Sequence, residues 1–318
     1  MWLHLLALLV FIVLFRWYKH SLTLENLADK CVLITGCDSG FGNQLAKKLD
    51  KRGMRVLATC LTEQGAENLK RESSSRLQTV ILDIADSNSV QSAAKWVSDV
   101  LGEKELWGLV NNAGTGMPGA PNEWLSREDF ARVLNVNLLG PIDVTLKLLP
   151  LIRKSKGRIV NVSSIVGRVT ICGGGYCVSK FGVEAFSDSL RRELKPFGVQ
   201  VSIIEPGYFK TGLNNMQVMK EALSKIWRNV HPEIHSSYGE TYFQDYVADL
   251  ERTFNFFSNK DLTAVTDCME HALTAMYPKT RYAAGWDAKL FFIPLSYVPT
   301  ALADYLLTWS APTPAYRI

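Results

Sequence analysis

Short apolar runs alternate with amphipathic stretches along most of the chain. Residues 30–35, 55–60 and 77–82 are apolar runs of strand length. A continuous run of this kind is typical of a strand buried on both faces of a parallel sheet. Residues 43–51, between the first two runs, have the spacing of a helix. The alternation of strand and helix predicts an α/β fold with a mostly parallel sheet.

The N-terminus carries a different pattern. Residues 2–18 are almost continuously apolar, and Arg16 and Lys19 follow at the C-terminal end of the run. This length just reaches that of a membrane-spanning helix, and no small-residue cleavage site follows, so an uncleaved anchor over residues 1–20 is favoured over a removed signal peptide. The two cations favour a cytosolic catalytic domain.

A second apolar run covers residues 290–309, but Pro294, Pro299 and Asp304 interrupt it. A single membrane span is therefore disfavoured. The segment 282–318 either faces the membrane or packs as an ordinary C-terminal helix against the core.

Composition narrows the classes of function. The chain has 318 residues, a net charge of +4 and scattered basic residues, which gives little support for nucleic-acid binding. Its six cysteines show no ligand spacing and are interpreted as free thiols. His231 and His235 are four apart, but Pro232 stands where a zinc-binding HExxH motif has glutamate, so no metal site is expected.

Tyr176 and Lys180 are four residues apart and would share one face of a helix. A cation near a phenol favours the phenolate and lowers the tyrosine pKa, so the pair could act as the base that accepts a proton when an alcohol is oxidised. The same spacing also occurs by chance on surface helices.

A glycine-rich turn follows the first predicted strand, with the spacing GxxxGxG at Gly36, Gly40 and Gly42. Such a turn lets backbone N–H groups approach a pyrophosphate at the positive end of a helix. It is also compatible with an ordinary tight turn. Ser39 and Phe41 belong to the same turn.

The residues at the ends of the second and third predicted strands indicate which dinucleotide would bind. Cys60 and Leu61 stand where a ribose-binding acid or a phosphate-binding arginine is usual, and no basic residue follows until Lys70, which favours NAD over NADP. Asp83 ends the third predicted strand. It would meet the adenine of a dinucleotide or cap the helix that follows.

Six motifs occur in the order of a classical short-chain dehydrogenase/reductase, and the chain resembles that family over about residues 29–200. The motifs are Thr35-Gly36-x-x-x-Gly40-x-Gly42, Asn111-Asn112-Ala113-Gly114, Asn137, Asn161-Val162-Ser163-Ser164, Tyr176-x-x-x-Lys180 and Pro206-Gly207. Several sequence segments are similar to those of the microsomal retinol and 3α/17β-hydroxysteroid dehydrogenases.

The resemblance implies a fold and a set of roles. The fold would be a Rossmann-type doubly wound, mostly parallel seven-stranded sheet with helices on both faces, over residues 29–281, including a substrate lid at about 208–260. Tyr176 would be the base, Lys180 would hold the nicotinamide ribose, and Asn137 would anchor a water in a proton relay. Ser164 would orient the substrate oxygen; Ser163 is adjacent, but Ser164 fits the Ser-x-x-Gly pattern. The remaining cofactor contacts would be Gly36, Ser39, Gly40, Phe41, Gly42, Asp83, Asn111, Ala113, Gly114, Pro206, Gly207 and Thr211.

The resemblance also implies the reaction and its setting. The expected activity is NAD-dependent oxidation of retinol to retinal, with a 3α- or 17β-hydroxysteroid as the alternative substrate and a non-catalytic lipid-binding protein as a remote alternative. Eight aromatic residues in the lid region suit a flat apolar ligand, although such residues are also common in a plain core. The protein is expected in the endoplasmic reticulum membrane, as a homodimer built on the helix that bears Tyr176.

Overall fold

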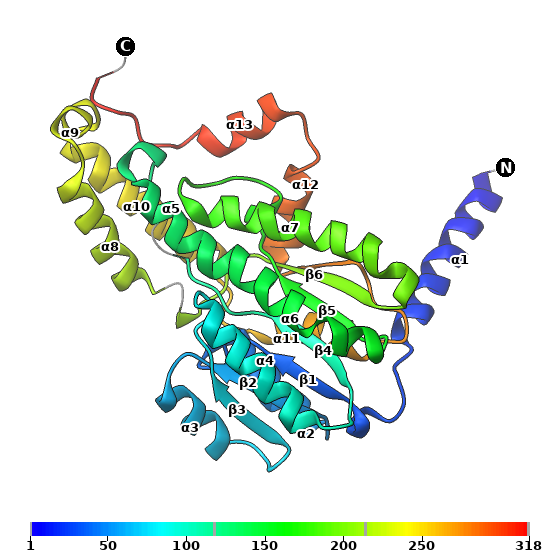
Figure 1. Cartoon of the computed structure of the whole chain (residues 1–318). Helices are drawn as coiled ribbons and strands as arrows, with labels where there is room; N and C mark the ends of the chain where they lie inside the picture. Colours follow the sequence, from blue (N-terminus) through cyan, green and yellow to red (C-terminus); the bar gives the residue numbers. More distant parts are fainter. Residues whose placement is uncertain (1, 117–118, 213–214, 317–318) are drawn as a thin grey trace.

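Seven parallel strands form one sheet with the order β3-β2-β1-β4-β5-β6-β7, which confirms the predicted fold class. The computed structural model describes residues 2–116, 119–212 and 215–316. Figure 1 shows the sheet between layers of helices. The strands are β1 (Cys31–Ile34), β2 (Arg55–Cys60), β3 (Leu77–Ile81), β4 (Leu106–Asn111), β5 (Arg158–Val162), β6 (Gln200–Pro206) and β7 (Arg281–Ala284).

Two hydrophobic cores hold the helices against the two faces of the sheet. Apolar side chains of α2 (Gly40–Lys51), α3 (Glu63–Arg71) and α11 (Thr263–Thr274) fill the core on one face. Those of α4 (Ser87–Leu101), α6 (Gly140–Lys154) and α7 (Gly175–Leu194) fill the core on the other. Burial on both faces explains why the central strands are apolar throughout.

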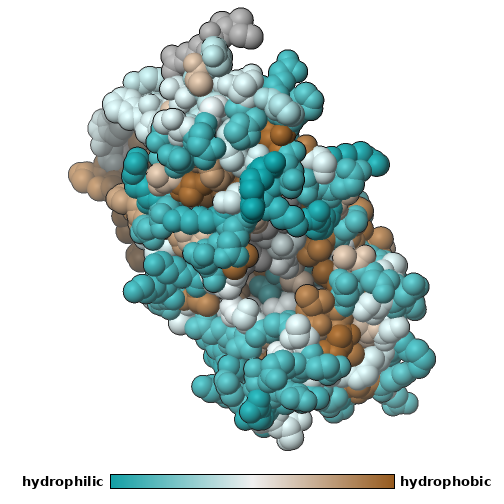
Figure 2. Space-filling model, turned by 90° about the vertical axis from the view of Figure 1, so that its left-hand side faces the viewer, coloured by the Kyte–Doolittle hydropathy of each residue, from teal (hydrophilic) through white to brown (hydrophobic). Residues whose placement is uncertain are grey.

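Strand order reverses between β1 and β4, and this reversal opens a crevice at the carboxyl ends of the strands. Figure 2 looks onto the side of the molecule that lies to the left in Figure 1 and shows a hollow near its centre, with hydrophobic side chains along one side of it.

Short irregular elements connect the layers on the active-site side. A π-helix (Asn135–Leu139) joins α5 (Arg127–Leu134) to α6, and a 3₁₀-helix (Ile165–Gly167) follows β5. Other 3₁₀ turns are Leu27–Asp29, Asn122–Trp124 and Lys195–Phe197.

The lid region folds into α8 (Met216–Asn229), α9 (Pro232–Tyr238) and α10 (Glu240–Phe257); residues 213–214 lie outside the described chain. Its aromatic side chains pack largely on one another. Trp227 lies 4.7 Å from Trp124 and 5.4 Å from Phe243, measured between ring centroids. Of the two alternatives for these aromatics, this packing favours the plain core.

The C-terminal run is interrupted before Pro299, the N-cap residue of its last helix, whereas Pro294 lies inside a short helix. It forms a π-helix (Ala288–Phe292), the short α12 (Ile293–Leu295) and α13 (Thr300–Thr308). Phe292 and Leu295 are buried, whereas Tyr305 and Trp309 are exposed. The segment therefore both packs on the core and presents an apolar surface.

One helix of the described chain, α1 (Trp2–Ser21), is long and apolar enough to span a membrane, and none of its residues is buried. Figure 1 shows it projecting from the rest of the fold. Only its base is tied down: the Nε2 atom of His271 lies 2.7 Å from the carbonyl oxygen of His20, and the Nδ1 atom of His20 lies 2.8 Å from that of Tyr277.

Candidate active site

A cavity of about 570 Å³ lies at the carboxyl ends of the strands and brings most of the predicted residues together. It extends between the glycine-rich turn and Tyr176. Its lining includes the predicted residues Gly36, Ser39, Gly40, Phe41, Asp83, Ala113, Gly114, Ser164, Tyr176, Lys180, Pro206, Gly207 and Thr211. Gly42, Asn111 and Asn137 are not part of that lining.

The glycine-rich turn is shaped by two left-handed residues. Gly36 and Gly40 have φ angles of 70° and 64°, which glycine adopts without strain. A Cβ at Gly42 would lie 2.4 Å from the carbonyl oxygen of Gly36, so this glycine serves close packing within the turn. The hydroxyl of Ser39, the N-cap residue of α2, makes no capping hydrogen bond within the described chain. The N-terminal N–H groups of α2 therefore suit an anionic pyrophosphate, and the turn fits a dinucleotide.

Tyr176 lies on the first turn of α7, with Ser164 as its polar neighbour. Burial raises the pKa of Tyr176 to about 12, and a hydrogen bond with the Ser164 hydroxyl opposes the rise. Ser163 is different, because its hydroxyl donates to the backbone carbonyl of Lys180 at 3.4 Å. The geometry therefore places Ser164, and not Ser163, beside the phenol.

Lys180 is buried one turn further along α7, with its ammonium 5.6 Å from the centroid of the Tyr176 ring. Its Nζ donates to the carbonyl oxygen of Val162 at 2.9 Å. Burial lowers the pKa of Lys180 to about 8, and the carboxylate of Glu184 opposes this. The expected lowering of the Tyr176 pKa by Lys180 is not seen, because desolvation of the phenol dominates.

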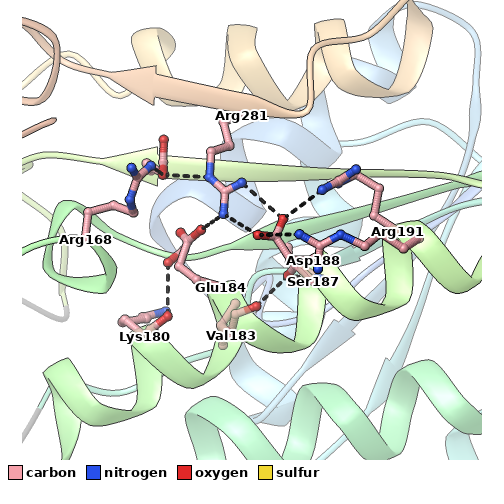
Figure 3. A network of polar contacts seen from close by, with 12 residues as sticks. Arg168, Lys180, Val183, Glu184, Ser187, Asp188, Arg191 and Arg281 are labelled. Atoms are coloured by element: carbon pink, nitrogen blue, oxygen red, sulfur yellow. Dashed lines mark hydrogen bonds and ion pairs between the residues drawn. The ribbon is translucent and has the colours of Figure 1, made fainter. Parts of the chain in front are cut away.

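Behind Lys180 lies a network of charged side chains that the sequence analysis missed (Figure 3). Arg281 of β7 donates to Glu184 at 2.7 Å and to Asp188 at 3.1 Å, both on α7. Its Nε lies 3.4 Å from the carboxylate of the buried Glu205, which also accepts from Arg168 at 3.0 Å. The network ties α7 to β6, β7 and the segment after Ser164. A glutamate inside the apolar strand Gln200–Pro206 was the available signal.

Asn137 lies in the π-helix and is buried. Its Nδ2 donates to the carbonyl oxygen of Thr115 at 2.7 Å, and its Oδ1 accepts from the Thr115 N–H at 2.7 Å. The same Nδ2 donates to the hydroxyl of Ser179 at 3.2 Å. Asn137 thus joins the loop after β4 to the helix that carries Tyr176, and its relay role stays a prediction.

Asn111 lies deeper, within β4. Its Nδ2 donates to the hydroxyl of Thr145 at 2.9 Å and to Oδ1 of Asn161 at 2.8 Å. These bonds direct its side chain into the core, away from the cavity lining. Asn112 next to it does reach the site, because its Nδ2 donates to the carbonyl oxygens of Thr35 and Gly36 at 2.9 and 3.0 Å.

Asp83, which follows β3, and the segment after β6 also line the cavity. The Asp83 carboxylate accepts from the Ala85 N–H at 2.9 Å. The N-cap of α4 is Asp86, not Asp83, so the capping alternative for Asp83 is wrong. A Cβ at Gly207 would lie 2.1 Å from the Asp287 carboxylate, which fixes the course of the backbone there.

A carboxylate that the sequence analysis overlooked lies at the end of the cavity near β2. Asp38 belongs to the glycine-rich turn, and its two oxygens accept from the N–H of Leu61 at 2.8 Å and of Thr62 at 3.0 Å. The Thr62 hydroxyl also donates to it at 2.7 Å. The acid that was sought after β2 is therefore supplied by the turn after β1.

The fold and the site together define an oxidoreductase that uses a nicotinamide dinucleotide. Residues 30–222 match the family model described as short chain dehydrogenase. The chain is 56% identical over 314 residues to retinol dehydrogenase 16 of Mus musculus, with 99% of each chain covered. It is 54% identical over 318 residues to 17-beta-hydroxysteroid dehydrogenase type 6 of Homo sapiens, with 100% of each covered.

Solved structures give the same result. A short-chain dehydrogenase from Streptomyces avermitilis has a TM-score of 0.69 and 25% sequence identity, with 89% of this chain and 97% of that one covered. The chain belongs to the short-chain dehydrogenase family and is an alcohol dehydrogenase/reductase.

Proposed function

We propose that this protein is a membrane-bound, NAD-dependent dehydrogenase that oxidises retinol to retinal. The observation that carries the proposal is the gathering of Tyr176, Lys180 and Ser164 in one cavity, in a chain similar over nearly its whole length to a retinol dehydrogenase. A 3α- or 17β-hydroxysteroid is the second candidate substrate, supported by the full-length similarity to a 17-beta-hydroxysteroid dehydrogenase.

The side chains divide the reaction between them. A nicotinamide ring bound beside Pro206 and Gly207 would accept the hydride from the carbinol carbon. Ser164 holds the substrate hydroxyl by a hydrogen bond, and Tyr176 takes its proton in the ionised form, which its raised pKa makes the minor form at neutral pH. Lys180 would hold the ribose hydroxyls, and its ammonium lies 5.6 Å from the centroid of the Tyr176 ring. Asn137 supports the loop at Thr115, which lines the cavity.

The preference for NAD rests on Asp38. Its carboxylate lies beside Leu61 and Thr62, at the end of β2, where related folds bind the adenosine ribose. A fixed negative charge there accepts hydrogen bonds from ribose hydroxyls and repels a 2′-phosphate. NADP is therefore the weaker cofactor.

The membrane assignment rests on α1, and the expected location is the endoplasmic reticulum with the catalytic domain in the cytosol. The apolar surface of α13 would lie on the same membrane and admit a lipophilic alcohol. Homodimer formation through α6 and α7 is supported by Leu146, Val178 and Phe181, large apolar residues that are exposed on these two helices.

The test is cofactor-dependent oxidation by membranes that express the protein. All-trans-retinol and a 3α-hydroxysteroid are each supplied with NAD or NADP, and Tyr176→Phe serves as the blank. Retinal formed with NAD and lost in Tyr176→Phe supports the proposal. Oxidation of the steroid but not of retinol would favour a hydroxysteroid as the substrate. If Tyr176→Phe retains full turnover, the assigned base is wrong.

A further inference from the structure

A pair of thiols lies beside the catalytic tyrosine. The sulfur atoms of Cys172 and Cys177 are 3.5 Å apart and form a hydrogen bond. Cys177 directly follows Tyr176 on the first turn of α7, and Cys172 stands in the loop that leads into this helix. Both thiols pack in the same hydrophobic cluster as Tyr176 and Tyr208.

The two cysteines differ in reactivity and in access. The hydrogen bond from Cys172 lowers the pKa of Cys177 to about 7, and hydrogen bonds with the backbone of Ile171, Cys172 and Cys177 contribute. Cys177 therefore carries a larger fraction of thiolate near neutral pH than an ordinary cysteine, and the thiolate is the nucleophilic form. The pKa of Cys172 is raised well above its ordinary value by the same hydrogen bond and by desolvation. Cys177 is buried and Cys172 is partly exposed, so an oxidant must be small to reach Cys177.

The backbone between the thiols can bring them together. A disulfide needs a sulfur separation of about 2.05 Å, so the two atoms must approach by roughly 1.5 Å. Residues 173–175 between them are all glycine, and Gly174 has a φ of 92°. Rotation of the two cysteine side chains, with a small movement at Gly174, provides this approach.

We infer that Cys172 and Cys177 form a reversible disulfide on exposure to a small peroxide, and that this modification suppresses catalysis at Tyr176. The Cys177 thiolate attacks one oxygen of hydrogen peroxide, and the O–O bond breaks to give a sulfenic acid and hydroxide. The sulfur of Cys172 then attacks the Cys177 sulfur and displaces the oxygen as water. The two thiols lose two electrons and two protons in total, and one peroxide becomes two waters.

Suppression follows from the position of the loop. Residues 168–174 connect the 3₁₀-helix after Ser164 to the helix that carries Tyr176. Both thiols already act on the phenol, since a charge on either of them raises the pKa of Tyr176. When the two sulfur atoms approach each other, this loop moves with them. A displacement of about 1 Å at a catalytic hydrogen bond can lower the reaction rate by about 100-fold.

The inference rests on the proposed function for its activity readout, but the disulfide itself is detected without turnover. The purified full-length protein in detergent is treated with hydrogen peroxide, and non-reducing peptide mass spectrometry then follows the peptide that contains both cysteines. We expect a loss of two hydrogens in this peptide, a fall of at least fivefold in alcohol oxidation, and recovery of both after dithiothreitol.

Single substitutions separate the steps. In Cys172→Ser the sulfenic acid at Cys177 has no thiol to resolve it, so dimedone should label Cys177 in this variant and not in the wild type. Cys268→Ser is the matched control, because Cys268 is half-buried on α11 away from this pair, and it should respond to peroxide as the wild type does.

Two results would overturn the inference. One is a peptide that keeps both free thiols while the protein remains folded. The other is a disulfide that forms without any change in turnover. A protein that forms the disulfide but oxidises no alcohol before treatment refutes the proposed function and leaves the redox chemistry of the pair standing.

Discussion

Glu184 lies one helical turn beyond Lys180, and its carboxylate raises the pKa of the Lys180 ammonium against the burial that lowers this pKa to about 8. The same carboxylate accepts from Arg281 at 2.7 Å. An acid outside the cavity lining thus supports the charge of a residue inside it. This relationship couples the charge of Lys180 to the charge network of Figure 3.

The first prediction concerns the pH dependence of NAD binding. Because Lys180 loses its proton as the pH rises through about 8, NAD binding should weaken over the same range. Glu184→Gln removes the charge that raises the Lys180 pKa, so the midpoint should move to lower pH. Titration of NAD binding at a series of pH values measures this midpoint.

Asp188→Asn is the control for this experiment. It also removes a partner of Arg281, but Asp188 is not among the groups that shift the pKa of Lys180. A similar shift of the midpoint in both variants would contradict the direct action of Glu184 on Lys180.

The sign of the stability effect follows from the same pKa. Unfolded lysine keeps its proton up to about 10.5, whereas folded Lys180 releases it near 8. The unfolded chain therefore binds more protons between these values, and the contribution of Lys180 to stability increases as the pH rises through this window.

The second prediction separates two adjacent serines. Ser164→Ala should lower kcat by roughly 100- to 1,000-fold, the usual cost of a donor that stabilises charge in the transition state. Ser163→Ala should cost less than about tenfold, since its hydroxyl donates to the backbone of α7. Steady-state kinetics of the two variants, with thermal denaturation to confirm folding, make the comparison. Equal losses would remove the assignment of Ser164.

The third prediction separates two adjacent asparagines. Asn111→Ala breaks the buried bonds to Thr145 and Asn161 and should lower the free energy of unfolding by about 2 kcal/mol, with little change in the Kd for NAD. Asn112→Ala releases the carbonyl oxygens of Thr35 and Gly36 and should raise that Kd. Thermal denaturation and NAD titration of both variants test this. A large rise of the Kd in Asn111→Ala would restore Asn111 as a cofactor residue.

Short sequence motifs were sufficient to predict many of the residues that line the cavity. The glycine turn, the Tyr176 and Lys180 pair, and the residues after β6 are each defined by short spacings, and the sheet brings their strand ends to one edge. Side-chain direction was not predictable in this way. Asn111 and Asn112 differ only in which side of the strand end they face, and the sequence assigned both to one motif.

Contacts between segments that are far apart in the sequence could not be predicted from its pattern either. Arg281 and Glu184 are 97 residues apart, and the fold alone brings them together. The aromatic residues of the lid were open to two interpretations, because a stripe that packs on Trp124 has the same spacing as one that would line a ligand site.

Asp38 supplies the last prediction, on cofactor preference. Cys60 and Leu61 stand at the end of β2, where an acid is usual, and Asp38 reaches that place from the turn after β1 and accepts hydrogen bonds from the N–H groups of Leu61 and Thr62. Asp38→Ser removes the negative charge and keeps a polar group. The ratio of kcat/KM for NAD to that for NADP should then fall at least tenfold, equivalent to about 1.4 kcal/mol.

Thr62→Val is the matched control for Asp38→Ser. It removes the hydroxyl that donates to Asp38 at 2.7 Å but leaves the carboxylate and both backbone donors in place. Because the charge is retained, the preference for NAD should persist in this variant. If instead Thr62→Val shifts the ratio as far as Asp38→Ser does, the shape of the turn, and not the charge of Asp38, determines the choice of cofactor.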